Sequence, residues 1–415
     1  MIPRWRWLLG LLTRRLWFRS TLISLLAIAS ALVSLLVAPY LPSGLSAKIG
    51  ADAVDSILTI IASSMLAVTT FSLSTMVSAY SAATSNVTPR ATKLLIEDST
   101  AQNVLATFVG SFLFSLVSLI TLSMGAYGER GRVVLFVVTI GVVLLIVITL
   151  LRWIDYLLRF GRVGETTAVV EDAAEAALRA RHENQYLGGT PLRSADDIPA
   201  AAVPVNADRI GYVQYVDMSA LNEVTERYET HIFLAAGPGT FMDPGRPLAF
   251  LAETVADEAK EDIRDAFTIA EERTYDQDPR FGLCVLAEIA SRALSPGIND
   301  PGTAIDVLGR SVRILAIWAG EAEPAEPVYP AVHVPTIELG ELFDDLFHPI
   351  ARDGAGTVEV QIRLQKALEA LARIGDGRFA AEARRHSGFA LQRADKALAL
   401  DEDRRRLKAA AAWAA

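Results

Sequence analysis

Four long apolar stretches in the first 160 residues constrain the fold more than any other feature of this chain. They run from about residue 20 to 40, 54 to 80, 103 to 125 and 133 to 158. Each reaches the roughly 20 residues that a helix needs to cross about 30 Å of hydrocarbon. A helix satisfies its own backbone hydrogen bonds, whereas an isolated strand in lipid would leave them unpaired. The sequence therefore predicts a domain of four transmembrane helices over residues 20–160.

The segment before the first apolar stretch mixes basic and aromatic side chains. Arginines stand at positions 4, 6, 14, 15 and 19, with aromatic rings between them at Trp5, Trp7, Trp17 and Phe18. This mixture is typical of a helix that lies at the membrane surface, and we expect one over residues 1–19. Basic residues also follow the second and fourth stretches, at Arg90, Lys93, Arg159 and Arg162, although Arg130 and Arg132 break the pattern. The balance predicts that both termini are cytoplasmic.

The second apolar stretch carries hydroxyl groups along one helical face. Steps of three, four or seven residues separate Ser56, Thr59, Ser63, Thr70, Ser74 and Ser78, so these side chains share a face. One interpretation is a helix that lines a water-filled path, where hydroxyls replace part of the hydration of an ion. The other is close packing of helices through small residues. The third stretch has Ser111, Ser115 and Ser118 at the same spacing, with the same two interpretations.

Ionisable residues are missing from the middle of all four stretches. Proton-coupled pumps and voltage sensors usually place such a residue within the membrane, so the pattern disfavours both classes. Arg152 and Asp155 stand near the inner end of the fourth stretch. Because they are about one helical turn apart, we expect them to form a local pair.

Charge rises sharply after residue 160, which predicts a second, soluble domain over residues 161–415. A length of 415 residues also favours two domains. The net charge of the chain is −9 and no basic stripe stands out, so nucleic-acid binding is not expected. The single cysteine, Cys284, excludes an intramolecular disulfide and is interpreted as a small buried residue.

The soluble domain is predicted to be α+β, with a β module at about 205–252 and a helical part at about 256–415. We expect a helix over 164–181, a loop over 188–204, and strands over 210–216 and 229–235. Short Gly-containing strand patterns between Gly211 and Leu248 resemble barrel-sandwich modules of the biotinyl and lipoyl type, but the carrier lysine is missing. Further helices are expected from about 279, at 301–318, 336–351 and 358–374, and from 378 to the end, with an extended connection at 324–335.

The turn before the 301–318 helix has two interpretations. Asp300 is suited to cap the helix and Pro301 to open it. The surrounding residues Ser295, Gly297, Asn299 and Asp300 are candidates for an anion site, because backbone amides at a helix start can hold an anion. The alternative is a tight helix-turn-helix whose Pro and Gly residues fix the geometry.

No motif for catalysis, metal binding or a cofactor emerges from the sequence. None of the five histidines stands at a metal-ligand spacing from another His or Cys. Asp344, Asp345 and His348 can meet on one helical turn, but such surface clusters are common without a metal. Phosphate-binding loops, nucleophile elbows and dinucleotide fingerprints are missing. We therefore predict no catalytic residue, no metal site and no cofactor, which weakens the enzyme interpretation without excluding it.

Several segments resemble a bacterial family of predicted inner-membrane proteins of unknown function. They are residues 71–77 (FSLSTMV), 88–90 (TPR), 276–283 (DQDPRFGL) and 293–304 (ALSPGINDPGTA). The resemblance covers nearly the whole chain. It implies a multi-pass protein of the bacterial inner membrane with four membrane helices and a cytoplasmic C-terminal domain, and it brings no site residue with it.

Two functional hypotheses follow. The first is a channel-like homo-oligomer in the lipid bilayer that conducts ions under the control of its cytoplasmic domain, because four helices in one protomer leave little room for a pore. The second is a non-conducting membrane scaffold or sensor whose cytoplasmic domain binds a protein partner. A membrane-anchored enzyme is a third class.

Overall fold

The computed structural model describes residues 13, 15–37, 51–125, 127, 129–320 and 326–414. They form two compact units. The N-terminal unit takes its described residues from 5–85 and 92–165, and the C-terminal unit takes them from 86–91 and 166–415. The interfacial helix expected over residues 1–19 falls almost entirely outside the described residues.

The N-terminal unit is helical throughout its described part. Three helices are long and apolar enough to cross a membrane, over Ala53–Ser85, Ser99–Ser123 and Gly131–Arg159, whereas the apolar helix Trp17–Ser30 is shorter. Three of the four predicted spans therefore have helices that qualify, and the first is present as a helix whose crossing is not established. The elements are α2 Leu16–Val37, α3 Ala51–Asn86, α4 Pro89–Ile96, α5 Ser99–Ser123 and α6 Glu129–Arg159.

Helices α3, α5 and α6 share an apolar core in which Met65, Phe108 and Trp153 are buried. The indole of Trp153 donates a hydrogen bond to the hydroxyl of Ser72 at 2.9 Å. Helix α2 packs against α5 and α6. The expected pair of Arg152 with Asp155 is not the one that forms, because Asp155 bonds to Arg159 at 2.7 Å. A carboxylate four residues before its arginine is the favourable order on a helix.

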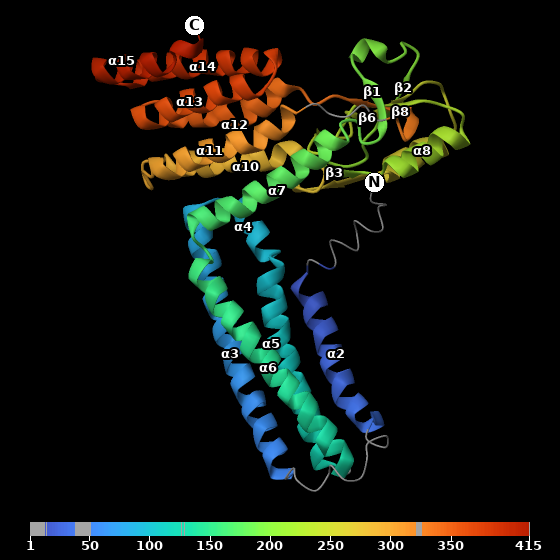
Figure 1. Cartoon of the computed structure of the whole chain (residues 1–415). Coiled ribbons are helices and arrows are strands. Elements are labelled where there is room, and N and C mark those ends of the chain that lie inside the picture. The colour runs from blue at the N-terminus through green and yellow to red at the C-terminus, as the bar shows by residue number, and fades with distance from the viewer. Residues whose placement is uncertain are drawn as a thin grey trace. The chain divides into compact units, whose positions relative to one another are not determined.

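The helical half of the C-terminal unit is a layered stack. Helices α10 and α12 lie next to each other, as do α11 and α13, α12 and α14, and α13 and α14 (Figure 1). The bounds of these elements are α7 Val163–Glu183, α10 Pro279–Ala293, α11 Pro301–Trp318, α12 Leu339–Asp353, α13 Val358–Ile374, α14 Gly377–Ala397 and α15 Asp401–Ala410.

The C-terminal helix predicted from residue 378 to the end is two helices. Helix α14 ends at Ala397 and α15 begins at Asp401. Between them Leu398 turns into extended backbone and is buried with Val358, Ala394 and Leu407. Burying these apolar side chains in one cluster requires the chain to fold back, which helical periodicity within one segment does not reveal.

The β half contains two small sheets. A five-stranded sheet has the order β1-β8-β4-β6-β2, and a three-stranded antiparallel sheet has the order β5-β3-β7. Strand β8 is parallel to both β1 and β4. The strands are β1 Gly189–Leu192, β2 Val203–Asn206, β3 Gly211–Val216, β4 Ile232–Leu234, β5 Phe241–Met242, β6 Pro247–Leu251, β7 Phe267–Ala270 and β8 Tyr329–Pro335, with helices α8 Met218–Arg227 and α9 Asp257–Asp265 between them.

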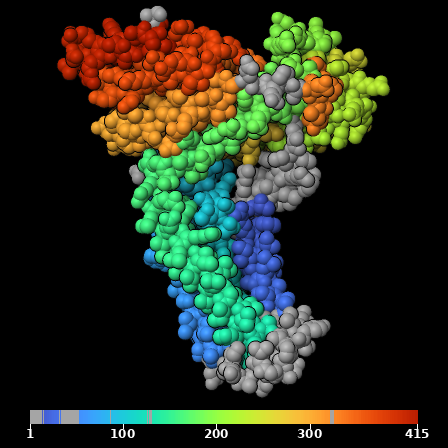
Figure 2. Space-filling view, in the orientation of Figure 1, coloured from blue at the N-terminus to red at the C-terminus, as the bar shows by residue number. Residues whose placement is uncertain are grey.

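This architecture extends beyond the β module expected at 205–252. The loop predicted over 188–204 contains β1 and the start of β2, and the extended connection predicted over 324–335 becomes β8. These strands are too short to show a clear alternation in sequence. The parallel pairs and helix α8 also separate this half from the barrel-sandwich modules that its glycine pattern resembles. Figure 2 shows the β half, mostly green and yellow with β8 in orange, beside the helices α10 to α15 in orange and red.

Two neighbouring helices of the helical half begin in the same way. Asp278 caps α10 and Asp300 caps α11, and each is followed by a proline at the first helical position. The prediction for Asp300 is confirmed. Proline fits there because its missing amide proton would have no helical partner in the first turn. The two caps set where α10 and α11 start, and they differ in burial, which matters for the site.

Candidate functional site

The six hydroxyl residues predicted to share one face of α3 all lie on its exposed side. Ser56, Thr59, Ser63, Thr70, Ser74 and Ser78 are exposed in the single chain. The buried side of the same helix carries Ser72, which binds Trp153. The hydroxyl face is therefore not used for packing among the described helices of the chain.

Several of these hydroxyls bond back to their own helix. Ser63 donates to the carbonyl of Thr59 at 2.9 Å, and Thr70 donates to that of Leu66 at 2.9 Å. Ser78 donates to the carbonyl of Ser74 at 3.0 Å. Each hydroxyl oxygen keeps lone pairs that can accept from water or from another chain. These three hydroxyls can therefore meet lipid without an unsatisfied donor and still offer oxygen atoms to an ion or a partner.

The serines of α5 behave differently. Ser111, Ser115 and Ser118 are buried inside the N-terminal unit. For α5 the packing interpretation is the one that fits, because small side chains let helices approach closely. The two helices share the same hydroxyl spacing, and burial distinguishes them.

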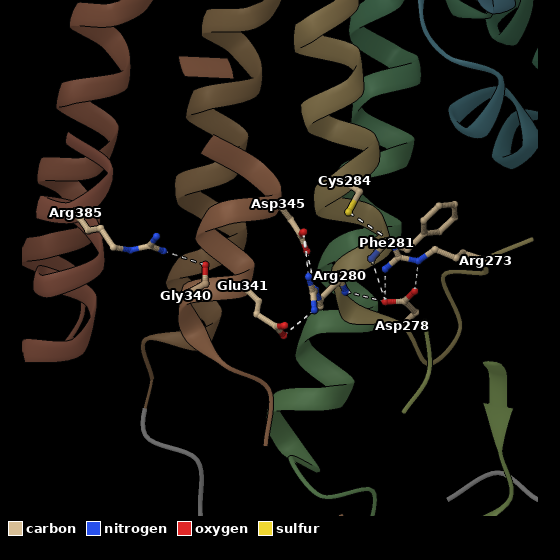
Figure 3. Close-up of polar contacts among 9 residues, drawn as sticks. All are labelled: Arg273, Asp278, Arg280, Phe281, Cys284, Gly340, Glu341, Asp345 and Arg385. Carbon is tan, nitrogen blue, oxygen red and sulfur yellow. Dashed lines mark hydrogen bonds and ion pairs between the residues drawn. The ribbon is translucent and has the colours of Figure 1, made fainter. Parts of the chain in front are cut away.

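A buried ion pair marks the start of α10 in the C-terminal unit. The Asp278 carboxylate is 1% exposed and accepts two hydrogen bonds from the Arg273 guanidinium, at 2.7 and 3.0 Å (Figure 3). It also accepts from the backbone amides of Arg280 and Phe281, which caps α10. Burial raises the pKa of the Asp278 carboxyl, and the Arg273 guanidinium works against that rise.

Gly239 of the β half packs directly on this carboxylate. Its φ is +89°, and a Cβ atom at this position would collide with the Asp278 carboxylate. A side chain would be both strained and obstructed there. Asp278 therefore joins the helical half to the β half of the C-terminal unit.

Arg280 connects α10 to α12. Its guanidinium bonds to Asp345 at 2.7 and 3.1 Å and to Glu341 at 2.6 Å (Figure 3). The hydrogen bonds that Arg280 donates to Asp345 raise the pKa of Arg280 above its usual range. One turn along α10, burial raises the pKa of the Cys284 thiol to about 11. The interpretation of Cys284 as an inert, largely buried residue fits this environment.

The Asp344, Asp345 and His348 cluster of α12 does not meet as one group. Asp345 faces Arg280 on α10. Asp344 and His348 face α14 instead, where Arg385 and His386 approach them. His386 has no signature at a short sequence spacing, because it lies on a different helix from Asp344 and His348.

The turn at residues 295–300 uses its own backbone groups. The amides of Ile298 and Asn299 donate to the carbonyl of Ser295, and the amide of Asp300 donates to that of Ala293. Hydrogen bonds from Thr303 hold the pKa of the Asp300 carboxyl below its usual range. Three backbone amides of the turn are therefore bonded to carbonyls nearby in the chain, and the turn exposes a carboxylate. Both features favour the structural interpretation. The anion site at Ser295, Gly297, Asn299 and Asp300 stays a prediction.

Two sequence segments that are far apart meet at α10. Thr88 donates to the Glu288 carboxylate at 3.2 Å, and Arg90 pairs with the same carboxylate at 2.6 Å. The hydroxyl of Tyr275 reaches the carbonyl of Arg90 at 3.5 Å. Residues 86–91 belong to the C-terminal unit and continue directly from α3. The carboxylate of Glu288 is therefore bound by the segment that follows the hydroxyl-bearing helix.

The chain belongs to the family described as Predicted membrane protein (DUF2254), whose model matches residues 13–370. It is similar to an uncharacterized protein of Mycobacterium bovis and to one of Mycobacterium tuberculosis, each 26% identical over 278 residues, or 65% of this chain and 53% of the relative. The chain spans about half the length of these curated relatives. No solved structure matches it. The family and the apolar helices together identify a membrane protein.

Proposed function

We propose that this membrane protein forms a channel-like homo-oligomer in which the hydroxyl faces of several α3 helices surround a path for ions. The observation that carries the proposal is the exposure of all six hydroxyl residues on the single chain, while the serines of α5 are buried. Hydroxyl groups make no hydrogen bonds with lipid tails, so contact with another copy of the helix or with water is more favourable for this face. A cyclic assembly would supply both.

The end of this face suggests which ions it would favour. Asp55 is exposed and stands one helical turn before Thr59, so it extends the hydroxyl face at the start of α3. In a ring of copies this position would become a ring of carboxylates, which favours cations over anions. The hydroxyls deeper along the face carry no charge, so they would contribute little discrimination among cations.

The proposed location is the bacterial inner membrane, with the C-terminal unit in the cytoplasm. Residues 86–91 and 166–415 belong to one unit, and α5 and α6 provide two crossings between them, so both lie on the same side. Arg90, Lys93, Arg159 and Arg162 fall on that side, which is the cytoplasmic one by the positive-inside rule. A cytoplasmic N-terminus requires α2 to cross as well, and reporter fusions at each terminus test this.

The experiment for the pore is cysteine accessibility in proteoliposomes, with Cys284 replaced by Ala. Cysteines at positions 63, 70 and 74 should react with a membrane-impermeant thiol reagent if the face lines water. A cysteine at position 115, which is buried in the single chain, is the control and should stay inert. Labelling at 115 equal to that at 70 would mean that the bundle itself is open and would overturn the assignment to α3.

Cation flux provides the second measurement. Ser74→Leu should reduce flux through liposomes and leave the oligomer intact, because a larger apolar side chain narrows and dries the path. Leu144→Phe is the control, since Leu144 is 61% exposed and lies on α6 rather than on the helix that carries the hydroxyl face. If the unsubstituted protein, Ser74→Leu and the control variant all gave the same flux, the hydroxyl face of α3 would not line the ion path.

The scaffold or sensor alternative has its own supporting observation. Because Ser63, Thr70 and Ser78 bond back to carbonyls of α3, the face does not require water. Under this alternative the cysteines are inert, Ser74→Leu disrupts assembly, and the purified protein passes no ions under voltage or tension.

A further inference from the structure

Three side chains from two helices bring possible metal ligands together in the C-terminal unit. Asp344 and His348 stand four residues apart on α12, and His386 stands on α14, which packs beside it. The Asp344 Oδ1 atom lies 3.1 Å from Nε2 of His386 and 3.6 Å from Nδ1 of His348. The three ligand atoms all lie within 4.8 Å of one another.

These separations suit a small divalent metal ion. Zinc binds imidazole nitrogen and carboxylate oxygen at about 2.0–2.2 Å, which places the ligand atoms of a tetrahedral site about 3.3 Å apart. Two of the three separations are already within a few tenths of an ångström of that value. Small side-chain shifts would close the set around one ion, with the fourth position left for water.

The two imidazoles are held by aromatic rings. His386 is 2% exposed and contacts the rings of Phe343, Phe347 and Phe389. His348 contacts His386 and Phe389. Burial lowers the pKa of both histidines, and the Asp344 carboxylate works against that shift. A metal binds the neutral form of an imidazole.

Arg385 gives the cluster a competing interpretation as a purely structural network. Its Nη2 atom donates to Asp344 Oδ1 at 2.8 Å and lies 3.2 Å from Nε2 of His386. A guanidinium only donates, so Nε2 of His386 either accepts from Arg385 or carries the proton and donates to Asp344 Oδ1, 3.1 Å away. Arg385 also bonds to Glu382 at 2.7 Å, so it keeps a partner if it leaves Asp344.

We propose that Asp344, His348 and His386 form a binding site for a divalent transition metal ion, best matched by Zn²⁺, and that the Arg385 guanidinium takes the place of the ion in the metal-free chain. Two neutral imidazoles and one carboxylate are a donor set that suits zinc and its neighbours better than Mg²⁺ or Ca²⁺. Asp345 is excluded from the site because Arg280 binds it. The proposal is independent of ion conduction.

The test is Zn²⁺ binding by the full-length protein in detergent, purified with a tag that contains no histidine and stripped with a chelator. Titration calorimetry should give one ion per chain. Co²⁺ in place of Zn²⁺ should produce the visible absorption bands of a tetrahedral nitrogen and oxygen site. Asp344→Asn and His348→Asn change partly exposed side chains and should fold, and each should weaken binding by at least the 10–100-fold that loss of even a supporting partner costs.

Two further variants distinguish a specific metal site from adventitious binding of the ion to other histidines. His333→Asn disrupts the exposed pair of His231 and His333, whose ring nitrogens are 3.1 Å apart, and should leave the affinity unchanged. Arg385→Gln removes the competing cation and should tighten binding relative to the unsubstituted protein. Binding that His333→Asn removes, or that survives both Asp344→Asn and His348→Asn, would overturn the proposal, as would an Arg385→Gln protein that binds more weakly.

Discussion

The two Asp-Pro caps of α10 and α11 provide a matched test of what burial adds to a helix cap. Asp278 and Asp300 have the same local sequence role, and each accepts hydrogen bonds from amides of the first turn. They differ in their other partner: Asp278 is buried against the Arg273 guanidinium, whereas Asp300 accepts a further hydrogen bond from the hydroxyl of Thr303, a neutral group in its own first turn. The comparison of Asp278→Ala with Asp300→Ala therefore separates the capping energy from the energy of the buried pair.

The magnitudes follow from these contacts. Removing an N-cap costs about 1 kcal/mol of folding free energy, and this is the whole expected effect of Asp300→Ala. Removing one partner of a buried ion pair costs about 3–5 kcal/mol, because the other charge stays buried without compensation. The Arg273 side chain is 21% exposed, so water relieves part of its charge, and we expect about 3 kcal/mol for Asp278→Ala.

Hydrogen exchange of α10 and α11 amides in the detergent-solubilised protein measures both effects. A loss of about 3 kcal/mol speeds exchange on the order of 100-fold, and a loss of about 1 kcal/mol speeds it about 5-fold. The double variant Arg273→Met with Asp278→Ala should recover part of the loss, since no charge is then left buried. If Asp278→Ala and Asp300→Ala increased the exchange rates equally, the buried pair of Arg273 with Asp278 would not be the source of the extra stability.

Three further predictions come from single contacts. Gly282→Leu should destabilise the C-terminal unit by about 1–3 kcal/mol, seen as a lower urea midpoint, because Gly282 lies directly against Ala174 of α7 and a side chain there must separate the helices. At pH 8 the Cys284 thiol should react with a soluble disulfide reagent roughly 100-fold more slowly than a thiol of pKa 9. Its pKa is raised to about 11, so a smaller fraction is the reactive thiolate. Equal rates in folded and urea-unfolded protein would contradict this. Glu288→Gln should cost no more than about 1 kcal/mol, since its pair with Arg90 is exposed, and in the channel proposal it should change ion flux while the oligomer persists.

The helices were the most predictable part of this fold, for physical reasons visible in single segments. Helix α11 has the predicted bounds because Asp300 and Pro301 fix its start. Helices α3, α5 and α6 follow from apolar length alone. The short strand β8 was predictable only as an extended segment, because its parallel partners β1 and β4 come from distant parts of the chain.

The candidate sites also depend on contacts between distant parts of the chain, which local sequence patterns do not reveal. The sequence placed the six hydroxyls on one face of α3, but only burial in the folded chain distinguishes them from the serines of α5. Asp344 and His348 were visible as neighbours at i and i+4. His386 joins them because α14 packs beside α12, a contact that follows from tertiary packing and has no signature in local spacing.

Three of the four segments of the family resemblance, residues 88–90, 276–283 and 293–304, meet at helix α10. Its first turn is capped by Asp278, which also holds Arg273 and lies against Gly239 of the β half. Its middle meets α7 at Gly282 and α12 through Arg280. Its later part binds residues 88–90 through Glu288, and those residues continue from α3. A change in the β half or in α12 that moved α10 would therefore act on residues 88–90, the segment that follows α3 in the chain.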